Sequence, residues 1–241
     1  YSSLASNSLV SSNPNYQVTG GTISVGITPA TLTYTANSAS KTYGDANPTF
    51  SGSVSGFVSG ETIANATTGT LAYSSLANGT SSVGTYTITG SGLTANNGNY
   101  TFTQAGVNST AFTINQRSIN ISGSRVYDGS VNFAAAQLSA GNIVNGDTVT
   151  LTGAATVSSK NVASYSSLAS NSLVSSNPNY QVTSGTISVG ITPATLTYTA
   201  NSASKTYGDA NPTFSGSVSG FVSGETIANA TTGTLAYSSL A

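Results

Sequence analysis

Tyr165–Ala241 opens with the sequence YSSLASNSLVSSNPNYQVTSGTISVGITPATLTYTANSASKTYGD and repeats Tyr1–Ala77 over its whole length. One position differs, where Ser184 replaces Gly20. The offset between the copies, from residue 1 to residue 165, is 164 residues, so the chain is one long period followed by part of a second. A fixed long period is typical of modules arranged in tandem.

Short apolar segments separated by turn residues fill this period. From Thr31 to Thr35, threonines alternate with Leu32 and Tyr34, which is the pattern of a half-buried strand. Asn97-Gly98 is a dipeptide typical of hairpin turns. No helical period is sustained, so the sequence predicts an all-β fold. Further strands are predicted at Tyr16/Val18, Ile23/Val25/Ile27, Leu71/Tyr73, Tyr86/Ile88, Tyr100/Phe102, Phe112/Ile114, Ile119/Ile121, Val149/Leu151, Tyr165, Tyr180/Val182 and Ile187/Val189/Ile191.

The period contains two distantly similar modules, because three short motifs recur in the same order. These are Lys41-Thr42-Tyr43 and Arg125-Val126-Tyr127, Gly60-Glu61-Thr62 and Gly146-Asp147-Thr148, and Asn99-Tyr100 and Asn179-Tyr180. We predict one type of module over residues 29–115 and the other over 116–193. Residues 1–28 would be the C-terminal half of the second type, and 194–241 the N-terminal half of the first. Several short strands with turns between them are typical of small Ig-like β-sandwiches.

The linkers between the predicted modules are short. Only Thr28–Ala30 and Asn115–Ser118 separate the last predicted strand of one module from the first strand of the next. Linkers of this length, one of them stiffened by Pro29, limit bending. We therefore predict an elongated rod in which one period spans about 40–70 Å.

Two of the motifs point to known families. The run Lys41–Pro48, followed by Gly60-Glu61-Thr62, resembles the MBG domain family. Val126-Tyr127-Asp128-Gly129, followed by Gly146-Asp147-Thr148, resembles the YDG domain family. Both families occur in tandem in very large bacterial surface and secreted proteins, often of the filamentous-haemagglutinin adhesin type. The resemblance implies an extracellular or cell-surface location and a structural class, and it implies no catalytic residues.

Composition narrows the function further. Charged residues are 5% of the chain and the net charge is −1, so there is no basic face for nucleic acid or anionic membrane. The chain has no histidine or cysteine, which removes the commonest general base, the commonest metal ligand and all thiolate chemistry. With 37% apolar residues it is nevertheless expected to fold. We predict that it is not an enzyme, with no catalytic, cofactor-binding or metal-binding residues.

Lys41, Tyr43 and Asp45 alternate along one segment, so their side chains can share a face. They could form a small polar site that recurs at Arg125, Tyr127 and Asp128. The favoured interpretation is structural: a packed tyrosine with a bonded hydroxyl, and a cation–carboxylate pair that fixes the turn. An isopeptide cross-link at Lys41 is disfavoured, because Arg125 takes its place in the second module.

Two binding functions compete with structural roles for other residues. Asp45, Glu61, Asp128 and Asp147 could bind calcium where modules meet, but they do not cluster at the alternate positions that calcium loops use. The aromatic faces of Tyr34, Tyr86 and Tyr100 suit a glycan, although their strand positions favour a place in the core. Glycosylation motifs, expected by chance in a chain rich in Ser, Thr and Asn, occur at Asn65, Asn78, Asn99, Asn108 and Asn120.

The sequence therefore predicts a structural stalk or fibre repeat of a secreted or cell-surface bacterial adhesin, spacing a distal binding domain from the cell. Its predicted partners are neighbouring repeats of the same chain or other copies in a fibre, with no nucleic acid, membrane insertion or cofactor. The alternative is a repeat that itself binds a glycan or a partner protein. Because half a sandwich exposes strand edges, we expect the chain to continue at both ends or to be completed by neighbouring chains.

Overall fold

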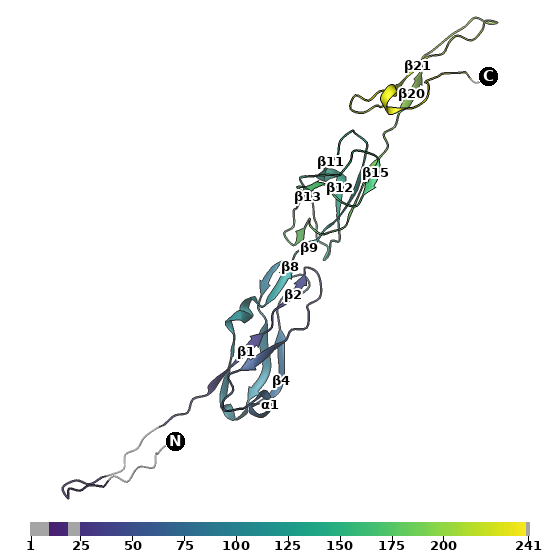
Figure 1. The fold of residues 1–241 in the computed structure, drawn as a ribbon. Coiled ribbons are helices and arrows are strands. Elements are labelled where there is room, and N and C mark those ends of the chain that lie inside the picture. The colour runs from purple at the N-terminus through teal and green to yellow at the C-terminus, as the bar shows by residue number, and fades with distance from the viewer. Residues whose placement is uncertain (1–9, 19–24, 240–241) are drawn as a thin grey trace. The chain divides into compact units, whose positions relative to one another are not determined.

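The computed structural model describes residues 10–18 and 25–239, and the strand predicted at Ile23 lies outside them. The fold is all-β, as predicted, and within these described residues each of the two α-helices is 4 residues long. The chain divides into two units (Figure 1). The first unit comprises Tyr1–Lys41, Ala46–Asn78 and Gly84–Ile114, and the second comprises Thr42–Asp45, Gly79–Val83 and Asn115–Ala241.

The elements up to residue 115 are β1 (Ala30–Ala36), β2 (Ala39–Thr42), β3 (Gly52–Ser55), α1 (Ile63–Ala66), β4 (Thr67–Ser74), β5 (Gly84–Tyr86), β6 (Thr89–Ala95), η1 (Asn96–Gly98), β7 (Tyr100–Gln104), η2 (Gly106–Thr110) and β8 (Phe112–Asn115). They form sheets in the orders β3-β1-β7, β2-β8-β5 and β4-β6. The segments at residues 42–45 and 79–83 belong to the second unit.

The remaining elements are β9 (Arg117–Ser118), β10 (Asn120–Val126), β11 (Asn132–Ala134), η3 (Ala135–Gln137), β12 (Leu138–Gly141), β13 (Leu151–Thr152), β14 (Ala154–Thr156), β15 (Ala163–Tyr165), β16 (Ser170–Asn171), β17 (Val174–Ser175), β18 (Tyr180–Gln181), β19 (Ile187–Thr192), β20 (Thr197–Ala200), β21 (Gly216–Ser219) and α2 (Ile227–Ala230). Their sheet orders are β12-β10-β19-β15, β11-β14-β16, β13-β17, β18-β9 and β20-β21.

Strand β1 organises the core of the first unit. Its alternation is the predicted one, with Leu32, Tyr34 and Ala36 buried between less buried threonines. β1 pairs antiparallel with β3 and parallel with β7, where Leu32 lies opposite Phe102. The ring of Tyr34 stacks on Phe102 with centroids 5.3 Å apart. Burying such aromatic and aliphatic side chains is the main stabilising contribution in a fold without disulfides.

Asn108 closes the end of β1 from inside the core. Its side chain is 1% exposed. Oδ1 accepts from the backbone N–H of Ala36 at 2.8 Å, and Nδ2 donates to the Tyr34 carbonyl at 3.0 Å and to Oε1 of Gln104 at 2.9 Å. Asn108 therefore satisfies backbone groups at the end of the strand, and a residue this buried is no acceptor for a glycan in the folded protein.

The second unit repeats the same pairing pattern with different residues. β10 pairs antiparallel with β12 and parallel with β19, in a register that sets Arg125 opposite Ile191. β9 pairs parallel with β18, which begins at Tyr180, just as β1 pairs parallel with β7, which begins at Tyr100. Buried side chains of these strands and of neighbouring segments make its core: Ile119, Ile121, Phe133, Leu138, Ala155, Val157, Leu173, Tyr180, Val189 and Ile191.

Identical sequence takes different structure in the two copies. Tyr180 and Ile191 lie in strands and are 2% exposed, whereas their counterparts Tyr16 and Ile27 lie outside any strand and are 72% and 77% exposed. The strands predicted at Tyr16/Val18 and Val25/Ile27 are therefore wrong for the first copy. In the second copy these residues form strands by pairing with β9 and β10.

Asn97-Gly98 also differs from its predicted role. Both residues have the positive φ angles that the dipeptide favours, 57° and 68°. However, they connect β6 to β7, which belong to different sheets. The dipeptide correctly marks a tight turn, but that turn is a crossover between sheets, because the partners of β6 and β7 are β4 and β1.

Candidate functional site: tyrosine loops and acidic turns

Among the residues that the structure describes, three turns present an acidic residue in the same way, and we call them the acidic turns. They are Val58–Glu61, Val144–Asp147 and Val222–Glu225. In each, the backbone N–H of the acidic residue donates to the valine carbonyl at 3.0 Å. The two central residues have positive φ in all three turns, which explains the Ser-Gly and Asn-Gly pairs there.

Two acidic turns bind a tyrosine from their own module. The backbone N–H of Val58 donates to the Tyr100 hydroxyl at 2.9 Å, and this hydroxyl donates to Glu61. In the second module, the N–H of Val144 donates to the Tyr180 hydroxyl at 3.0 Å, and Tyr180 donates to Oδ2 of Asp147 at 2.8 Å. The Asn-Tyr motif and the Gly-Glu/Asp-Thr motif are thus two halves of one arrangement.

Asp147 binds a second tyrosine, Tyr43, which comes from the loop after β2. The Tyr43 hydroxyl donates to Oδ2 of Asp147 at 2.9 Å. Its ring meets the ring of Tyr180 edge to face, with centroids 5.6 Å apart. Both tyrosines are buried, so one carboxylate oxygen holds two phenols away from water. Hydrogen bonds to a charged acceptor in such a setting contribute about 1.5–3 kcal/mol each.

The rest of this contact is equally close. Gly44 packs so tightly on the acidic turn that a Cβ there would collide with Val144. Nε of Arg117 donates to the Tyr43 carbonyl at 2.7 Å, and its Nη2 pairs with Asp45. Residues 43–45 and 127–129 are called the tyrosine loops below. The first tyrosine loop is held by an acidic turn and by an arginine on β9.

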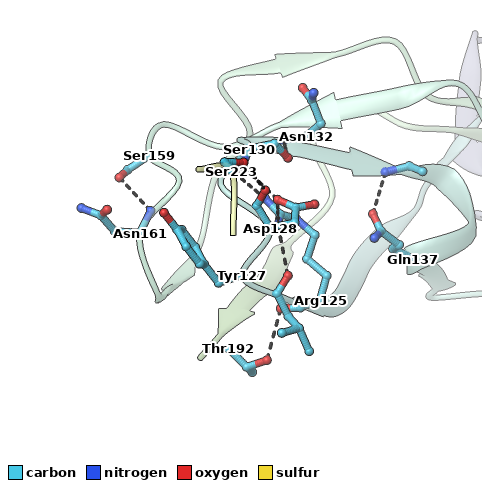
Figure 2. A network of polar contacts seen from close by, with 12 residues as sticks. Arg125, Tyr127, Asp128, Ser130, Asn132, Gln137, Ser159, Asn161, Thr192 and Ser223 are labelled. Atoms are coloured by element: carbon cyan, nitrogen blue, oxygen red, sulfur yellow. Dashed lines mark hydrogen bonds and ion pairs between the residues drawn. The ribbon is translucent and has the colours of Figure 1, made fainter. Parts of the chain in front are cut away.

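The second tyrosine loop makes the corresponding contact with the third acidic turn. The Tyr127 hydroxyl donates to Oε1 of Glu225 at 2.7 Å. Ser223 Oγ donates to the Asp128 carbonyl at 3.2 Å, and a Cβ on Gly129 would collide with Ser223. Figure 2 shows Tyr127 and Asp128 with Ser223 beside them. We call each contact between a tyrosine loop and an acidic turn a joint.

The predicted cation–carboxylate pair is present at Arg125. Nη1 of Arg125 lies 2.5 Å from Oδ1 of Asp128, and Nη2 donates to the Ser130 carbonyl at 2.6 Å (Figure 2). The guanidinium lies 4.9 Å from the centroid of the Phe133 ring. In the first module the roles differ, because Lys41 Nζ donates to the Asn78 carbonyl at 2.6 Å and Asp45 pairs with Arg117.

The environment raises the pKa of three of these phenols. The hydrogen bond to Glu61 raises the pKa of Tyr100 above its ordinary value of 10.0, and the bond to Glu225 does the same for Tyr127. For Tyr180 the larger cause of the raised pKa is burial, and the bond to Asp147 adds to it. A phenolate beside a carboxylate is unfavourable, so each arrangement holds its tyrosine neutral.

Alkaline titration should therefore weaken these arrangements. A raised pKa in the folded state means that the stability contributed by the neutral phenol is complete below pH 10 and is lost as pH rises through the folded pKa. We expect Tyr100, Tyr127 and Tyr180 to titrate above pH 10. Tyrosine-selective carbon-13 NMR measures this directly. Titration of all three at or below pH 10 would contradict the assignment.

The described residues do not form the calcium or glycan sites that were considered from the sequence. Within residues 10–18 and 25–239, no three acidic side chains gather as metal ligands would. Tyr34 and Tyr100 are buried, so neither offers an open ring face to a sugar. Across the described part of the chain, no helix has the length and apolar character needed to cross a membrane.

The joints could not be read from the sequence as contacts. The sequence offered Tyr43 and Tyr127 as candidates for a polar site. It offered Glu61 and Asp147 as candidates for a calcium site. The available signal was that the tyrosine motif and the acidic motif recur together in each module. Their separation in the sequence, 104 residues between Tyr43 and Asp147, concealed that one module's tyrosine meets the next module's acid.

Comparison with known proteins bears on the modules directly. A scan against protein-family models matches the MBG domain (YGX type) at residues 32–113 and 196–240, and the YDG domain at residues 110–187. Comparison with curated proteins and with solved structures gave no match. The MBG segments cover more than half of the sequence, so the chain belongs to the MBG domain (YGX type) family, with a YDG domain between its two MBG segments.

Proposed function

We propose that this chain is a structural repeat of a stalk or fibre in a secreted or cell-surface bacterial adhesin. Its modules would be small Ig-like sandwiches whose main partners are the neighbouring repeats. The observation that carries the proposal is the recurrence of the joint. Tyr43 binds Asp147 and Tyr127 binds Glu225, so two successive pairs of modules are linked by the same chemistry.

The joint suits a spacer better than a catalyst. It is a tyrosine hydroxyl that donates to a carboxylate beside a closely packed glycine. Because both elements also belong to the folded modules, such joints would link successive modules without a separate linker domain. A chain of such modules would place a distal binding domain away from the cell, which is the role proposed for it.

Small-angle X-ray scattering of the full chain tests the spacer function. A compact globule of this length would have a radius of gyration of about 18 Å, and an unfolded chain about 54 Å. We expect a value clearly between the two, with the skewed distance distribution of an extended particle. The Tyr43→Phe, Tyr127→Phe double variant, which removes only the two hydroxyl groups, should show more flexible scattering. A radius near 18 Å for the native chain would refute the proposal.

The alternative function, binding of a glycan or partner protein by the repeat itself, is tested on the same material. Binding of the full chain on a glycan array or to host cells would favour it. An extended particle without such binding supports the spacer.

A further inference from the structure

The three acidic turns hold different numbers of tyrosines. Asp147 accepts from Tyr180 of its own module and from Tyr43 of the preceding one. Glu225 accepts from Tyr127 of the preceding module. Glu61 accepts from Tyr100 of its own module, and among the described residues no tyrosine loop reaches it. Glu61 is also exposed, whereas Asp147 and Glu225 are half-buried.

A hollow of about 550 Å³ lies beside Glu61, and we call it the Glu61 socket. Pro29, Ala30, Val58 and Tyr100 line it. The counterpart beside Glu225 is lined by the equivalent residues Pro193, Ala194 and Val222. It measures about 210 Å³, and Tyr127 and Val162 of the YDG domain enter it. The two hollows thus share equivalent lining residues. Ile27 and Thr28 also line the Glu61 socket, and of the two hollows only the second is lined by the tyrosine of a tyrosine loop.

We propose that the Glu61 socket binds the tyrosine loop of a YDG-type module. The tyrosine hydroxyl would donate to Glu61, completing the two-phenol arrangement seen at Asp147. An apolar residue equivalent to Val162 would cover Val58. This inference deepens the proposed function by naming the partner of the socket, and it rests on that proposal only in treating joints as links between modules.

The observations favour a YDG-type loop over an MBG-type loop. The acidic turn Val58–Glu61 has the same sequence as Val222–Glu225, which binds the Tyr127 loop, whereas Val144–Asp147 differs and binds the Tyr43 loop. Ser59 corresponds to Ser223, whose hydroxyl recognises the backbone beside Tyr127. In addition, Ile27–Ala30 repeats the connector Ile191–Ala194 that joins the YDG domain to the Glu225 turn. We therefore assign the source to a YDG-type module directly preceding the socket.

A single introduced cysteine measures occupancy of the socket, because the chain contains no other thiol. In the 241-residue chain, Val58→Cys should react with a maleimide several-fold faster than Val222→Cys, the matched position in the filled counterpart. A copy of residues 116–164 is then placed before Tyr1, which supplies the preceding YDG-type module. In this extended chain Val58→Cys should slow to the rate of Val222→Cys.

Phenylalanine substitutions provide the control for the hydroxyl. Tyr127→Phe in the added copy should restore fast reaction at Val58→Cys, while Tyr127→Phe in the original copy should affect only Val222→Cys. Carbon-13 labelling of glutamate gives a second readout, because Glu61 and Glu225 are the only two glutamates. The Glu61 carboxyl signal should move on extension and move back with phenylalanine in the added copy.

Several results would overturn the assignment. The first is an unchanged rate of maleimide reaction at Val58→Cys in the extended chain. The second is protection that stays the same when the tyrosine of the added copy is changed to phenylalanine. The third is an added module that NMR shows to be unfolded. Protection that rises with the concentration of the 241-residue chain would instead assign the socket to a second copy. None of these outcomes changes the result expected from the scattering test of the spacer function. The two proposals can therefore fail separately.

Discussion

Asp147→Ala is expected to destabilise the second unit by about 2–5 kcal/mol, one of the two largest effects predicted for this chain. Asp147 is the acceptor for the hydroxyls of both Tyr43 and Tyr180, which are 3% and 2% exposed. Alanine leaves both phenols without that acceptor in a place that water reaches poorly. Each lost bond to a charged group carries a cost of this order because the phenol was desolvated on folding.

Urea unfolding followed through NMR signals of the second unit measures the effect of Asp147→Ala. Asp209→Ala is the matched control, because the same change is made in an exposed loop. The amide of Val144, which donates to the Tyr180 hydroxyl, should also exchange faster in Asp147→Ala alone. Equal unfolding midpoints for the two variants would show that the carboxylate contributes nothing to the joint.

Asn108→Ala is expected to destabilise the first unit by about 2–4 kcal/mol. The substitution removes the acceptor of the Ala36 N–H and a donor to the Tyr34 carbonyl, deep in the core. It also removes a bond to Gln104, whose side chain in turn bonds the backbone of Gly90. The loss should therefore extend from β1 to β6.

Val107→Ala is the control for Asn108→Ala, since it changes the adjacent residue of the same 3₁₀ segment at a side chain that is 64% exposed. Hydrogen exchange at Ala36 should increase in Asn108→Ala and stay unchanged in Val107→Ala. If both variants unfold at the same urea concentration, the buried amide network is not a source of stability.

Sequence pattern predicted the parts of the fold that depend on local alternation. Leu32, Tyr34 and Phe112 are buried where the period of two placed them, and Phe112 is fully enclosed. The same reasoning failed at Tyr16 and Ile27, because an alternating segment becomes a strand only when a partner strand is present. The burial of Asn108 was not predicted, because nothing in the serine- and threonine-rich sequence around it indicates that its side-chain amide is in the core.

The candidate site was predicted only as separate residues. Periodicity placed Tyr43 and Asp45 on one segment and aligned Glu61 with Asp147. Their meeting depends on tertiary structure, because a turn with two positive φ angles in one module must present its acid to a loop of another. The spacing of residues along the sequence does not show that the tyrosine and the acid come into contact. The repetition of both motifs in each module was the one sign that they are related.

The parallel pairing of β10 with β19 bears on how the second unit responds to tension. β10 lies near the point where the chain enters the domain and β19 near the point where it leaves, and they pair over six positions from Ile121/Ile187 to Val126/Thr192. Pulling the two chain ends apart would slide these strands along each other, so that every rung of the ladder is loaded at once. An antiparallel hairpin, by contrast, peels open rung by rung from its free end. If the chain carries tension along a fibre, as proposed, this topology would give the domain resistance to shear.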